Sequence, residues 1–495
     1  SALGWGPSGR RFKSCLPDFD QPDFVHHECA AHPILSDETR THGFLTVEQR
    51  REVGRAARKR IPRSALGEFA PADELRDPVA ILQADDIGRV EQLVPIRYGR
   101  MLTSPFAFYR GAASLMAGDL ASGTHSGLFA QMCGDAHLSN FGLFAAPDRR
   151  LIFDCNDFDE TLPGPWEWDL KRLAASLVIA ARSNGTTVAE AESTALAASA
   201  AYRDRMRELA QMTNMAVWHQ RMEVDRILEL LERTENQAGA AQVSKVAEKA
   251  YTRDSMREFE KLTKVVDGHR RIVADPPLIV PAEDVAKELG ITMDSGQVAA
   301  FLRDVIESYK SRLLVDRRRL LDQYELVHIA RKVVGVGSVG TRVWIVLLVG
   351  RDDNDPLFLQ IKEAGASVYE QYLGASEYET PGARVIAGQR LMQGASDPLL
   401  GYETVDTLDG TRRDFYVRQL KDWKGSVKIE KLTPTQLAGY GALCARVLAR
   451  AHARSGDRIS IAGYLGKSDG LDVAGARFAA ACADQNERDC ARMRE

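Results

Sequence analysis

The glycine-rich segment Gly335-Val-Gly-Ser-Val-Gly limits the possible folds of this 495-residue sequence more than any other feature. Glycines at this spacing can bind phosphates through backbone N–H groups, either at the start of a helix or in a hairpin between two strands. The residues that follow, Val343-Trp-Ile-Val-Leu-Leu-Val, are apolar and β-branched, which predicts a strand. We therefore expect a glycine-rich hairpin and not a dinucleotide-binding unit, in which a helix would follow.

The strand after this hairpin ends in a basic residue. Leu357-Phe-Leu-Gln-Ile-Lys is strand-like and follows the polar turn at 350–356. A cation at Lys362 suits the α- and β-phosphates of ATP. The expected phosphate contacts are therefore Gly335, Gly337, Ser338, Gly340 and Lys362.

A second segment with residues suited to catalysis is Cys133-Gly-Asp-Ala-His-Leu-Ser-Asn-Phe-Gly. The apolar runs around it predict a strand, this loop, and two more strands at 141–146 and 151–153, separated by a turn. Asp135 and Asn140 are five residues apart, with His137 between them. A carboxylate there can orient and deprotonate an attacking hydroxyl, while the amide holds a divalent metal. A metal-dependent phosphoesterase, in which Gly-Asp and His bind metals, is an alternative.

Four acidic residues follow the last of these strands: Asp154, Asp157, Asp159 and Glu160. Carboxylates this close repel one another unless a cation neutralises some of them. We expect Mg²⁺, held by carboxylate and phosphate oxygens. The glycine and the terminal Glu of an EF-hand are missing, so a calcium loop is not expected.

These two segments resemble the aminoglycoside-phosphotransferase and choline-kinase branch of the protein-kinase-like superfamily. That branch has the motifs H-G-D-x-H-x-x-N, I-D-F-D and D-L-A, and the matching residues here are Gly134–Asn140, Asp157-Phe-Asp and Asp169-Leu-Lys-Arg-Leu-Ala. The step from Asp157 to Asp169 agrees with the family, whereas Cys133 replaces its first His.

The resemblance implies roles for these residues. Asp135 would be the catalytic base, and Asn140 would hold the metal together with an aspartate. Asp154 fits the family's separation from Asp135 better than Asp157 does, so both aspartates are candidate ligands.

Lys362 resembles the V-A-I-K lysine of kinases, which pairs with an acid on the following helix. Glu370 is the first choice for that acid, and Glu377 and Glu379 are alternatives, because the helix predicted at Ala383–Gln393 has no acid. The segment Tyr416–Trp423, which includes Gln419, would supply the hinge that meets adenine.

The full set of motifs also resembles a bacterial family called domain of unknown function 2252, from about residue 40 to the C-terminus. The matching segments include Ser104-Pro-Phe-Ala-Phe-Tyr-Arg-Gly and Lys332-Val-Val-Gly-Val-Gly-Ser-Val-Gly-Thr-Arg. Arg110, in the first of them, would contact either a phosphate or a buried Asp.

The motifs occur in the reverse of the usual kinase order, because the loop at Asp135 precedes Lys362. A circular permutation explains this order. The predicted helix at 434–452 resembles the kinase helix that leads into the catalytic loop, yet here it is close to the end of the sequence.

We therefore expect an α+β, two-lobed, protein-kinase-like fold that is circularly permuted, with extra N-terminal and inserted helices. The expected parts are an extended arm at 1–44, a helical lobe at 45–325 completed by helices at 429–495, and a sheet-rich lobe at 326–428. Thr46 is the predicted N-cap of the first helix.

Composition excludes some classes of function. A net charge of −4 argues against a dedicated nucleic-acid-binding protein, and no apolar run is long enough for a transmembrane helix. The absence of a signal-peptide pattern and of paired cysteines favours a cytoplasmic protein with reduced thiols. His26, His27, Cys29 and His32 could bind zinc but lack a partner cluster.

The expected function is an ATP- and Mg²⁺-dependent phosphotransferase acting on a hydroxyl. An inactive nucleotide-binding regulatory module and a nucleotidyl (AMP) transferase on the same fold remain open, as does the phosphoesterase. The sequence identifies neither the acceptor, a small molecule or a protein, nor the oligomeric state.

Overall fold

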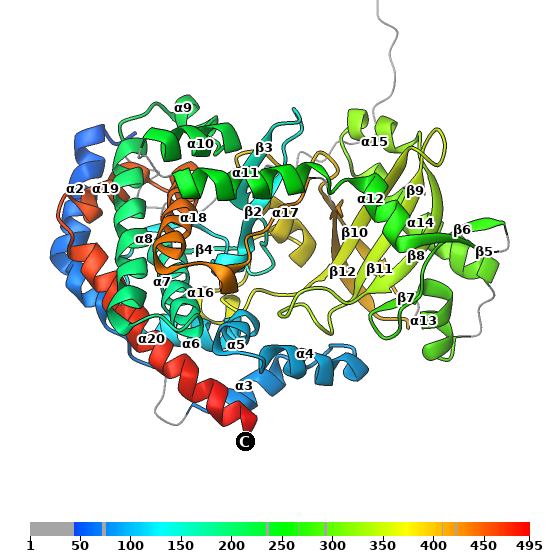
Figure 1. Ribbon diagram of the computed structural model, residues 1–495, viewed down its shortest axis with the longest axis horizontal. Helices are drawn as coiled ribbons and strands as arrows, with labels where there is room; N and C mark the ends of the chain where they lie inside the picture. The colour runs from blue at the N-terminus through cyan, green and yellow to red at the C-terminus, as the bar shows by residue number, and fades with distance from the viewer. Residues whose placement is uncertain are drawn as a thin grey trace, which may run out of the picture. The chain divides into compact units, whose positions relative to one another are not determined.

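A six-stranded antiparallel sheet includes Lys362 in one strand, and the glycine-rich segment connects two neighbouring strands of this sheet (Figure 1). The computed structural model describes residues 44–71, 76–233, 237–266, 268–291, 295–407, 409–420 and 423–495. The strand order is β11-β12-β10-β9-β8-β7. The strands are β7 (Ile279–Pro281), β8 (Glu325–Lys332), β9 (Val343–Val349), β10 (Pro356–Ala364), β11 (Gly401–Asp406) and β12 (Arg412–Gln419).

Both faces of this sheet are covered, which explains why β9 is apolar along its whole length. Val346 and Leu348 pack with residues of three helices, α13 (Ala282–Glu288), α14 (Ser295–Ser311) and α15 (Val315–Leu321). Ile345 and Leu347 point to the opposite face. There they pack with α12 (Ser255–Leu262) and the hairpin of β5 (Thr263–Val266) and β6 (His269–Ile272).

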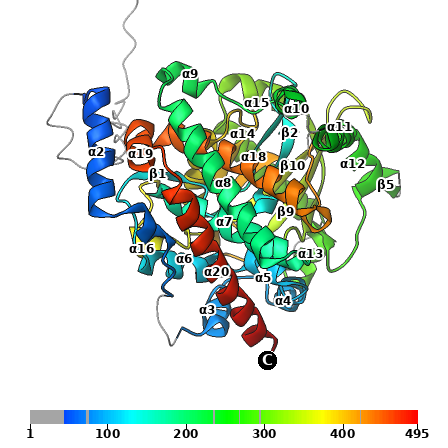
Figure 2. The same cartoon turned by 60° about the vertical axis from the view of Figure 1, so that its left-hand side comes forward.

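The helical part has a separate, larger core, in which α7, α8, α18 and α20 pack against one another (Figure 2). Helix α7 is buried over most of its length. The helices outside the sheet part are α2 (Val47–Arg60), α3 (Pro78–Ala84), α4 (Val94–Met101), α5 (Pro105–Gly111), α6 (Ala113–Ser122), α7 (Trp166–Ser183), α8 (Val188–Leu209), α9 (Asn214–Trp218), α10 (Val224–Arg233), α11 (Gln237–Tyr251), α16 (Glu370–Leu373), α17 (Pro381–Met392), α18 (Pro434–Ser455), α19 (Arg458–Leu465) and α20 (Gly470–Arg494).

Two small antiparallel sheets hold the loop at 133–140. Strand β1 (Phe129–Met132) pairs with β4 (Leu162–Pro165), and β2 (Phe141–Ala145) pairs with β3 (Leu151–Cys155). The loop connects β1 to β2, so its two ends are fixed by different strand pairs. The predicted sequence of strand, loop, strand, turn and strand is confirmed here.

Several sequence predictions hold and others need correction. The mixed α+β class is confirmed, and Thr46 caps α2 as expected, in a capping box with Gln49. The helical lobe expected at 45–325 also includes the β5–β6 hairpin and strand β7. Residues 255–321, expected in the helical part, share their buried side chains with the sheet, because the sheet has a second apolar face to cover.

Other predictions fall on residues that the structure does not describe. The arm at 1–44, apart from Phe44, and the His26–His32 cluster lie outside the described residues. Among the described helices, none has a stretch long and apolar enough to cross a membrane.

Candidate active site

The loop between β1 and β2 is held by Asp169, near the start of α7. The carboxylate of Asp169 accepts hydrogen bonds from the backbone N of Cys133 (2.8 Å) and of Gly134 (3.0 Å), and it contacts Nε2 of His452 (3.1 Å). Gly134 has φ +84°, and a Cβ there would lie 2.2 Å from the carbonyl oxygen of Glu160. The loop conformation therefore requires glycine at 134, and Asp169 positions the loop without lining a cavity.

Asp135 projects from this loop toward an arginine. Nε and Nη2 of Arg172 both lie 2.8 Å from Oδ1 of Asp135, and the Arg172 guanidinium stacks on the Tyr109 ring at 3.9 Å. Nδ2 of Asn140 donates to the backbone carbonyl of Asp135 (2.8 Å). One oxygen of Asp135 is thus held by Arg172, while Oδ2 lies 3.5 Å from Nε2 of His137.

His137 and Arg110 place buried nitrogen atoms beside Asp135. Nδ1 of His137 and Nε of Arg110 have no hydrogen-bond partner among the described residues. Burial lowers the pKa of His137 to about 4, although the charge of Asp135 opposes this, so the imidazole is neutral at pH 7. Burial also lowers the pKa of Arg110. Arg110 makes no ion pair with a described residue, which disfavours the purely structural role considered for it.

Lys362 lies on β10, opposite Tyr416 of β12. It is 3% exposed and forms an ion pair with Asp159, which also accepts a hydrogen bond from the Tyr416 hydroxyl (2.8 Å). Burial acts to lower the pKa of Lys362, but the charges of Asp157 and Asp159 outweigh it and raise the pKa. The lysine is therefore charged and neutralises part of the acidic segment.

The pKa values of the two aspartates beside Lys362 are shifted in opposite directions. Burial, helped by the charge of Asp159, raises the pKa of Asp157. Burial acts in the same direction on Asp159, but the charge and hydrogen bond of Lys362, together with Tyr416 and Arg418, outweigh burial and lower the pKa of Asp159. The repulsion expected from the sequence is thus present, and within the described residues Lys362 and Arg418 supply the positive charge that relieves it.

A cavity of about 450 Å³ joins the two distant sequence segments. The 133–140 loop contributes Asp135, His137 and Asn140, and the segment after β3 contributes Asp157, Asp159 and Glu160. From the opposite side, the glycine-rich turn contributes Gly335, Gly337 and Ser338, and Arg110 of α5 also lines the cavity. Lys362 lies behind Asp159, outside the lining.

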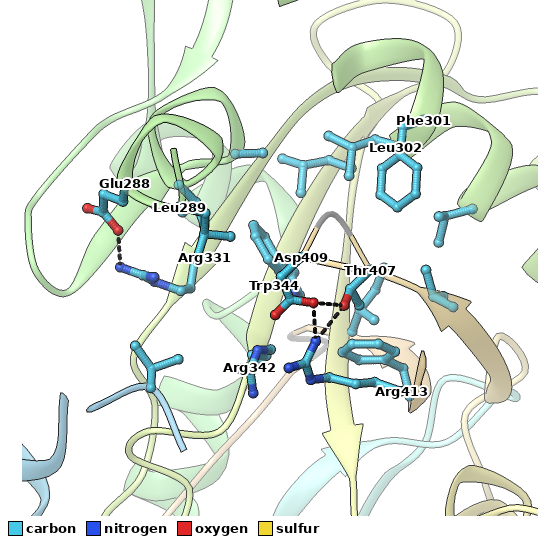
Figure 3. Close-up of a pocket in the computed structure, with 18 of the residues that line it drawn as sticks. Glu288, Leu289, Phe301, Leu302, Arg331, Arg342, Trp344, Thr407, Asp409 and Arg413 are labelled. Atoms are coloured by element: carbon cyan, nitrogen blue, oxygen red, sulfur yellow. Dashed lines mark hydrogen bonds and ion pairs between the residues drawn. The ribbon is translucent and has the colours of Figure 1, made fainter. Parts of the chain in front are cut away.

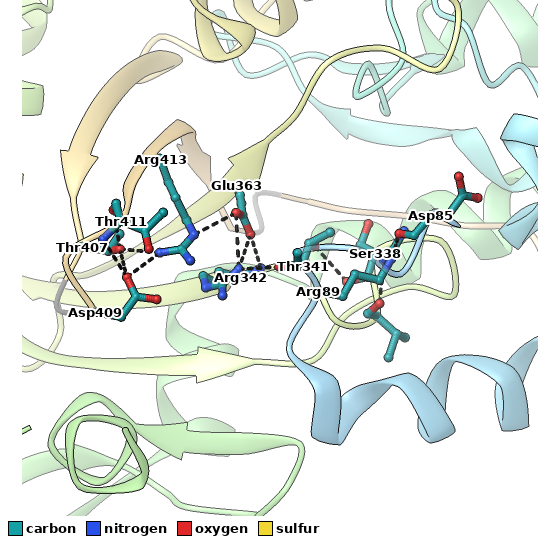
Figure 4. Close-up of polar contacts among 12 residues, drawn as sticks. Asp85, Arg89, Ser338, Thr341, Arg342, Glu363, Thr407, Asp409, Thr411 and Arg413 are labelled. Atoms are coloured by element: carbon teal, nitrogen blue, oxygen red, sulfur yellow. Dashed lines mark hydrogen bonds and ion pairs between the residues drawn. The ribbon is translucent and has the colours of Figure 1, made fainter. Parts of the chain in front are cut away.

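Arginines of the N-terminal segment hold the glycine-rich turn. Nη1 of Arg89 (Figure 4) donates to the carbonyl oxygens of Gly337 (3.1 Å) and Val339 (2.7 Å). Nη1 of Arg100 donates to the carbonyl oxygen of Val334 (2.7 Å). Gly340 has φ +93° and packs against Arg89 instead of lining the cavity. The expected glycine hairpin is present between β8 and β9, but Gly340 serves its conformation and not the cavity.

The family model described as "Uncharacterized protein conserved in bacteria (DUF2252)" matches residues 89–495. The chain belongs to the DUF2252 family. No curated protein and no solved structure matches it.

Two site predictions for this DUF2252 protein need correction. Glu370 does not pair with Lys362. It accepts a hydrogen bond from the backbone N of Ser367 (2.9 Å) and lies 3.5 Å from Nε of Arg384. Asp159 takes the place expected for Glu370, Glu377 or Glu379 as the partner of Lys362.

Asp154 is the second correction. It is 1% exposed, forms an ion pair with Arg450, and accepts a hydrogen bond from the backbone N of Gly394 (2.8 Å). It does not line the cavity, whereas Asp157 does. Of the two candidate metal ligands, only Asp157 is therefore placed beside Asn140.

Gln419 lies at a smaller cavity of about 240 Å³ in this DUF2252 protein. Leu143, Asn156 and Leu420 also line it. Nη1 of Arg418 donates to the carbonyl oxygen of Asn156 (3.0 Å), and the next residue, Asp157, lines the larger cavity. The two cavities are therefore adjacent, on either side of the segment that follows β3.

The sequence did not predict the contacts of Arg172 with Asp135, of Tyr416 with Asp159 or of His452 with Asp169, and Tyr416 was expected only as the start of the hinge segment. Arg172 follows Asp169 by one helical turn, so the motif Asp169-Leu-Lys-Arg contained a usable signal. Tyr416 and His452 lie far from their partners in sequence, and only the packing of β12 and α18 brings them there.

Glu160 gives a test of the cavity's electrostatics. Burial raises the pKa of Glu160 from its ordinary value of 4.5 to about 7, although its hydrogen bond from the backbone N of Val368 (2.8 Å) opposes this. The folded state therefore binds this proton more tightly than the unfolded state. Its contribution to stability is complete below pH 4.5 and is lost as the pH rises through about 7.

We predict that Glu160→Gln, which cannot ionise, removes this part of the pH dependence. When the pH rises from 5 to 7.5, the free energy of unfolding of the wild type should fall by about 1–2 kcal/mol more than that of the variant. This value is smaller than the full pKa shift would give, because the side chain faces the cavity and is partly screened by solvent. Urea unfolding at several pH values measures this difference. Glu192→Gln, at an exposed site on α8, should follow the wild-type curve. Parallel curves for the wild type and Glu160→Gln would contradict the prediction.

Proposed function

We propose that this protein is an ATP- and Mg²⁺-dependent phosphotransferase with a circularly permuted, two-lobed, protein-kinase-like fold, and that it phosphorylates a hydroxyl group. The observation that carries this proposal is the single cavity shared by Asp135, Asn140 and Asp157 on one side and by the glycine-rich turn on the other.

The sheet part supports a kinase-like nucleotide lobe. The glycine-rich turn joins β8 to β9, and Lys362 lies on β10, the strand that follows. Kinases have the same succession, with a glycine-rich loop over the phosphates and a lysine on the third strand. The backbone N–H groups of Gly335, Val336 and Gly337 have no partner among the described residues, so they are available to phosphate oxygens.

The helical part supports the permutation. The C-terminal end of α18 lies beside β1, because Oγ of Ser455 accepts a hydrogen bond from the backbone N of Gln131 (3.1 Å). A chain joined at this point would run from α18 into β1 and then into the Asp135 loop, which is the usual kinase order. Contacts of this kind survive when chain ends move to a new place on the surface.

Asp135 is suited to orient the acceptor hydroxyl and to take its proton. Arg172 fixes one carboxylate oxygen, which leaves Oδ2 for the hydroxyl. Oxygen of the acceptor then attacks the γ-phosphorus, the bond to the β-phosphate oxygen breaks, and ADP leaves. In this reaction the protein contributes mainly positioning and charge neutralisation.

Arg110, and not Lys362, is the cation placed for direct contact with the phosphates. It lines the cavity with an unpartnered Nε, whereas Lys362 is occupied by Asp159. We assign Lys362 to neutralising Asp157 and Asp159, which allows phosphate to approach them. The adenine would occupy the adjacent cavity, beside Gln419, Leu420 and Leu143.

The acidic residues fit a magnesium ion bound together with nucleotide. Among the described residues no group of three or more His, Cys, Asp or Glu could hold a metal alone. Mg²⁺ at nucleotide sites needs only one or two protein ligands, because phosphates and water supply the others. Asn140 and Asp157 would hold it, and when bound it would neutralise charge on the β- and γ-phosphates.

Transfer of labelled phosphate tests the proposal. The purified full chain is incubated with Mg²⁺ and a bacterial metabolite and protein extract, in parallel with [γ-³²P]ATP and with [α-³²P]ATP. We expect a labelled acceptor only with the γ-labelled nucleotide, labelled ADP from the α-labelled nucleotide, and neither product in EDTA. An acceptor labelled from the α-phosphate would instead indicate AMP transfer. ATP binding without label in either reaction would indicate a regulatory module.

A further inference from the structure

A second cavity lies on the face of the six-stranded sheet opposite the candidate active site (Figure 3). Lys362 and Tyr416 point toward Asp159, and the preceding residue on each strand, Ile361 and Phe415, lines this second cavity. The alternation follows from the strand geometry, in which successive side chains point to opposite faces. Helices α13 and α14 and the ends of β11 and β12 enclose it.

The cavity has the size and lining of a small-molecule site. Its volume is about 310 Å³, at the lower end of the range for ligand pockets. Its walls are apolar side chains from α13, α14 and five strands of the sheet, among them Leu302, Val305, Ile329 and Trp344. An apolar ligand bound here would remove these apolar side chains from water, which favours binding.

The rim is basic and includes a buried donor without an acceptor. Four arginines line the cavity (Arg89, Arg331, Arg342 and Arg413), against three carboxylates (Glu91, Glu288 and Asp409). Arg413 is satisfied by Asp409 at 2.7 Å. Arg331 is 6% exposed, and its Nη2 contacts Glu288 (3.1 Å), but its Nε has no partner among the described residues. A buried N–H group without an acceptor lowers the stability of the fold. The carboxylate of a ligand would supply the missing acceptor.

A network of polar contacts connects this rim to the glycine-rich turn (Figure 4). Glu363, which lines the candidate active site, lies 3.4 Å from Nε of Arg413 and accepts a hydrogen bond from the backbone N of Arg342 (3.0 Å). Arg89 lines both cavities and holds the carbonyls of Gly337 and Val339. The two cavities are thus separated by the thickness of a few side chains.

We propose that the second cavity binds a small molecule with an apolar body and a single carboxylate head, and that its occupancy stabilises the glycine-rich turn. The apolar body lies over Trp344 beneath α14, and the carboxylate accepts from Nε of Arg331. This ligand site does not depend on the proposed phosphotransferase activity.

Binding of decanoate and decanol tests the site by isothermal titration calorimetry, with both probes below their aggregation concentration. Decanoate should bind the wild-type chain with a dissociation constant on the order of 10–100 µM, and decanol at least about 5-fold more weakly. Arg331→Met should weaken decanoate at least about 10-fold and change decanol less than about 2-fold, because only the acid uses the guanidinium. Val305→Trp should weaken both at least about 10-fold by filling the cavity.

Matched variants control for unspecific effects. Arg226→Met removes an arginine that pairs with Glu229 on α10, and Val473→Trp places an indole on the exposed face of α20, so both should bind decanoate as the wild type does. No decanoate binding to the wild type, equal affinities for acid and alcohol, or an unchanged decanoate affinity in Arg331→Met would each overturn the proposal. The Arg331→Met comparison decides the matter even if Val305→Trp fails to fold.

Amide hydrogen exchange measures the effect on the glycine-rich turn. Saturating decanoate should slow exchange at residues 335–342 at least about 3-fold in the wild type and have no effect there in Arg331→Met. Unchanged exchange with bound decanoate would overturn the coupling. Neither result requires ATP turnover, so failure of this inference is distinguishable from failure of the proposed function.

Discussion

Replacing Asp135 with Asn should reduce phosphoryl transfer about 10²–10⁴-fold while leaving ATP binding within a few fold of the wild type. The amide keeps the size of the carboxylate but cannot accept the hydroxyl proton. Asp135 lines the cavity and its Oδ1 is held by Arg172, so Oδ2 is the oxygen left to take the proton. The measurement is the initial rate of label transfer from [γ-³²P]ATP, together with calorimetric ATP binding in the same preparation.

Asp135→Asn leaves the Arg172 guanidinium buried beside Tyr109 without a charged partner. The control must therefore separate a loss of catalytic rate from a loss of folded protein. Thermal unfolding should therefore show some loss of stability, and the rate comparison is made well below the melting temperature. Asp225→Asn, at an exposed position of α10, changes the same functional group and should behave as the wild type. Full transfer by Asp135→Asn would exclude Asp135 as the base. Loss of ATP binding together with activity would indicate a structural role instead.

The predicted site residues that the structure brings together are those whose proximity is set by local spacing. Asp135 and Asn140 lie five residues apart on one short loop, so their proximity follows from the chain itself. The glycine-rich hairpin is also local, because the strands it joins pair directly through it. Motifs of this kind hold their geometry whatever the rest of the fold does.

Predictions that depended on packing between distant segments were less successful. Glu370 is close to Lys362 in sequence, yet the ion pair goes to Asp159, because β10 faces the segment after β3 and not the short helix α16. Asp154 and Asp157 could not be separated by counting residues. Asp154 is still within β3 and faces Arg450 of α18, whereas Asp157 has left the strand and reaches the cavity.

Which segments cover the two faces of the sheet could not be predicted from the sequence. Residues 255–321 read as further helices of a helical lobe, but helix periodicity identifies an apolar stripe without identifying its partner. The apolar run Val343–Val349 did contain the relevant information, since a strand that is apolar at every position must be buried on both faces. Two covering layers could have been expected from that run, although the segments that form them could not.

Removing the charge of Lys362 should have the largest effect on stability of any single change at this site. In Lys362→Met the carboxylates of Asp157 and Asp159 remain close together, and their counter-charge is reduced to Arg418. Breaking a buried ion pair from one side typically costs 3–5 kcal/mol. Because the side chain of Asp159 is 29% exposed, we expect the lower end, about 3 kcal/mol, in the free energy of unfolding measured with urea at pH 8.

The pH dependence and a second substitution identify the cause of this loss. Without the ammonium, the pKa of Asp159 should rise, so protonation relieves the repulsion and the deficit should shrink as the pH falls from 8 to 5. Lys362→Met combined with Asp159→Asn should recover most of the stability, because the double variant leaves one carboxylate instead of two. Lys287→Met, which breaks an exposed pair with Asp284, should cost at most about 0.5 kcal/mol. A deficit that is independent of pH and is not rescued by Asp159→Asn would mean that Lys362 stabilises the fold by packing against Tyr416. In that case the acidic segment would not need a cation, and the argument for magnesium at Asp157 would lose its electrostatic basis.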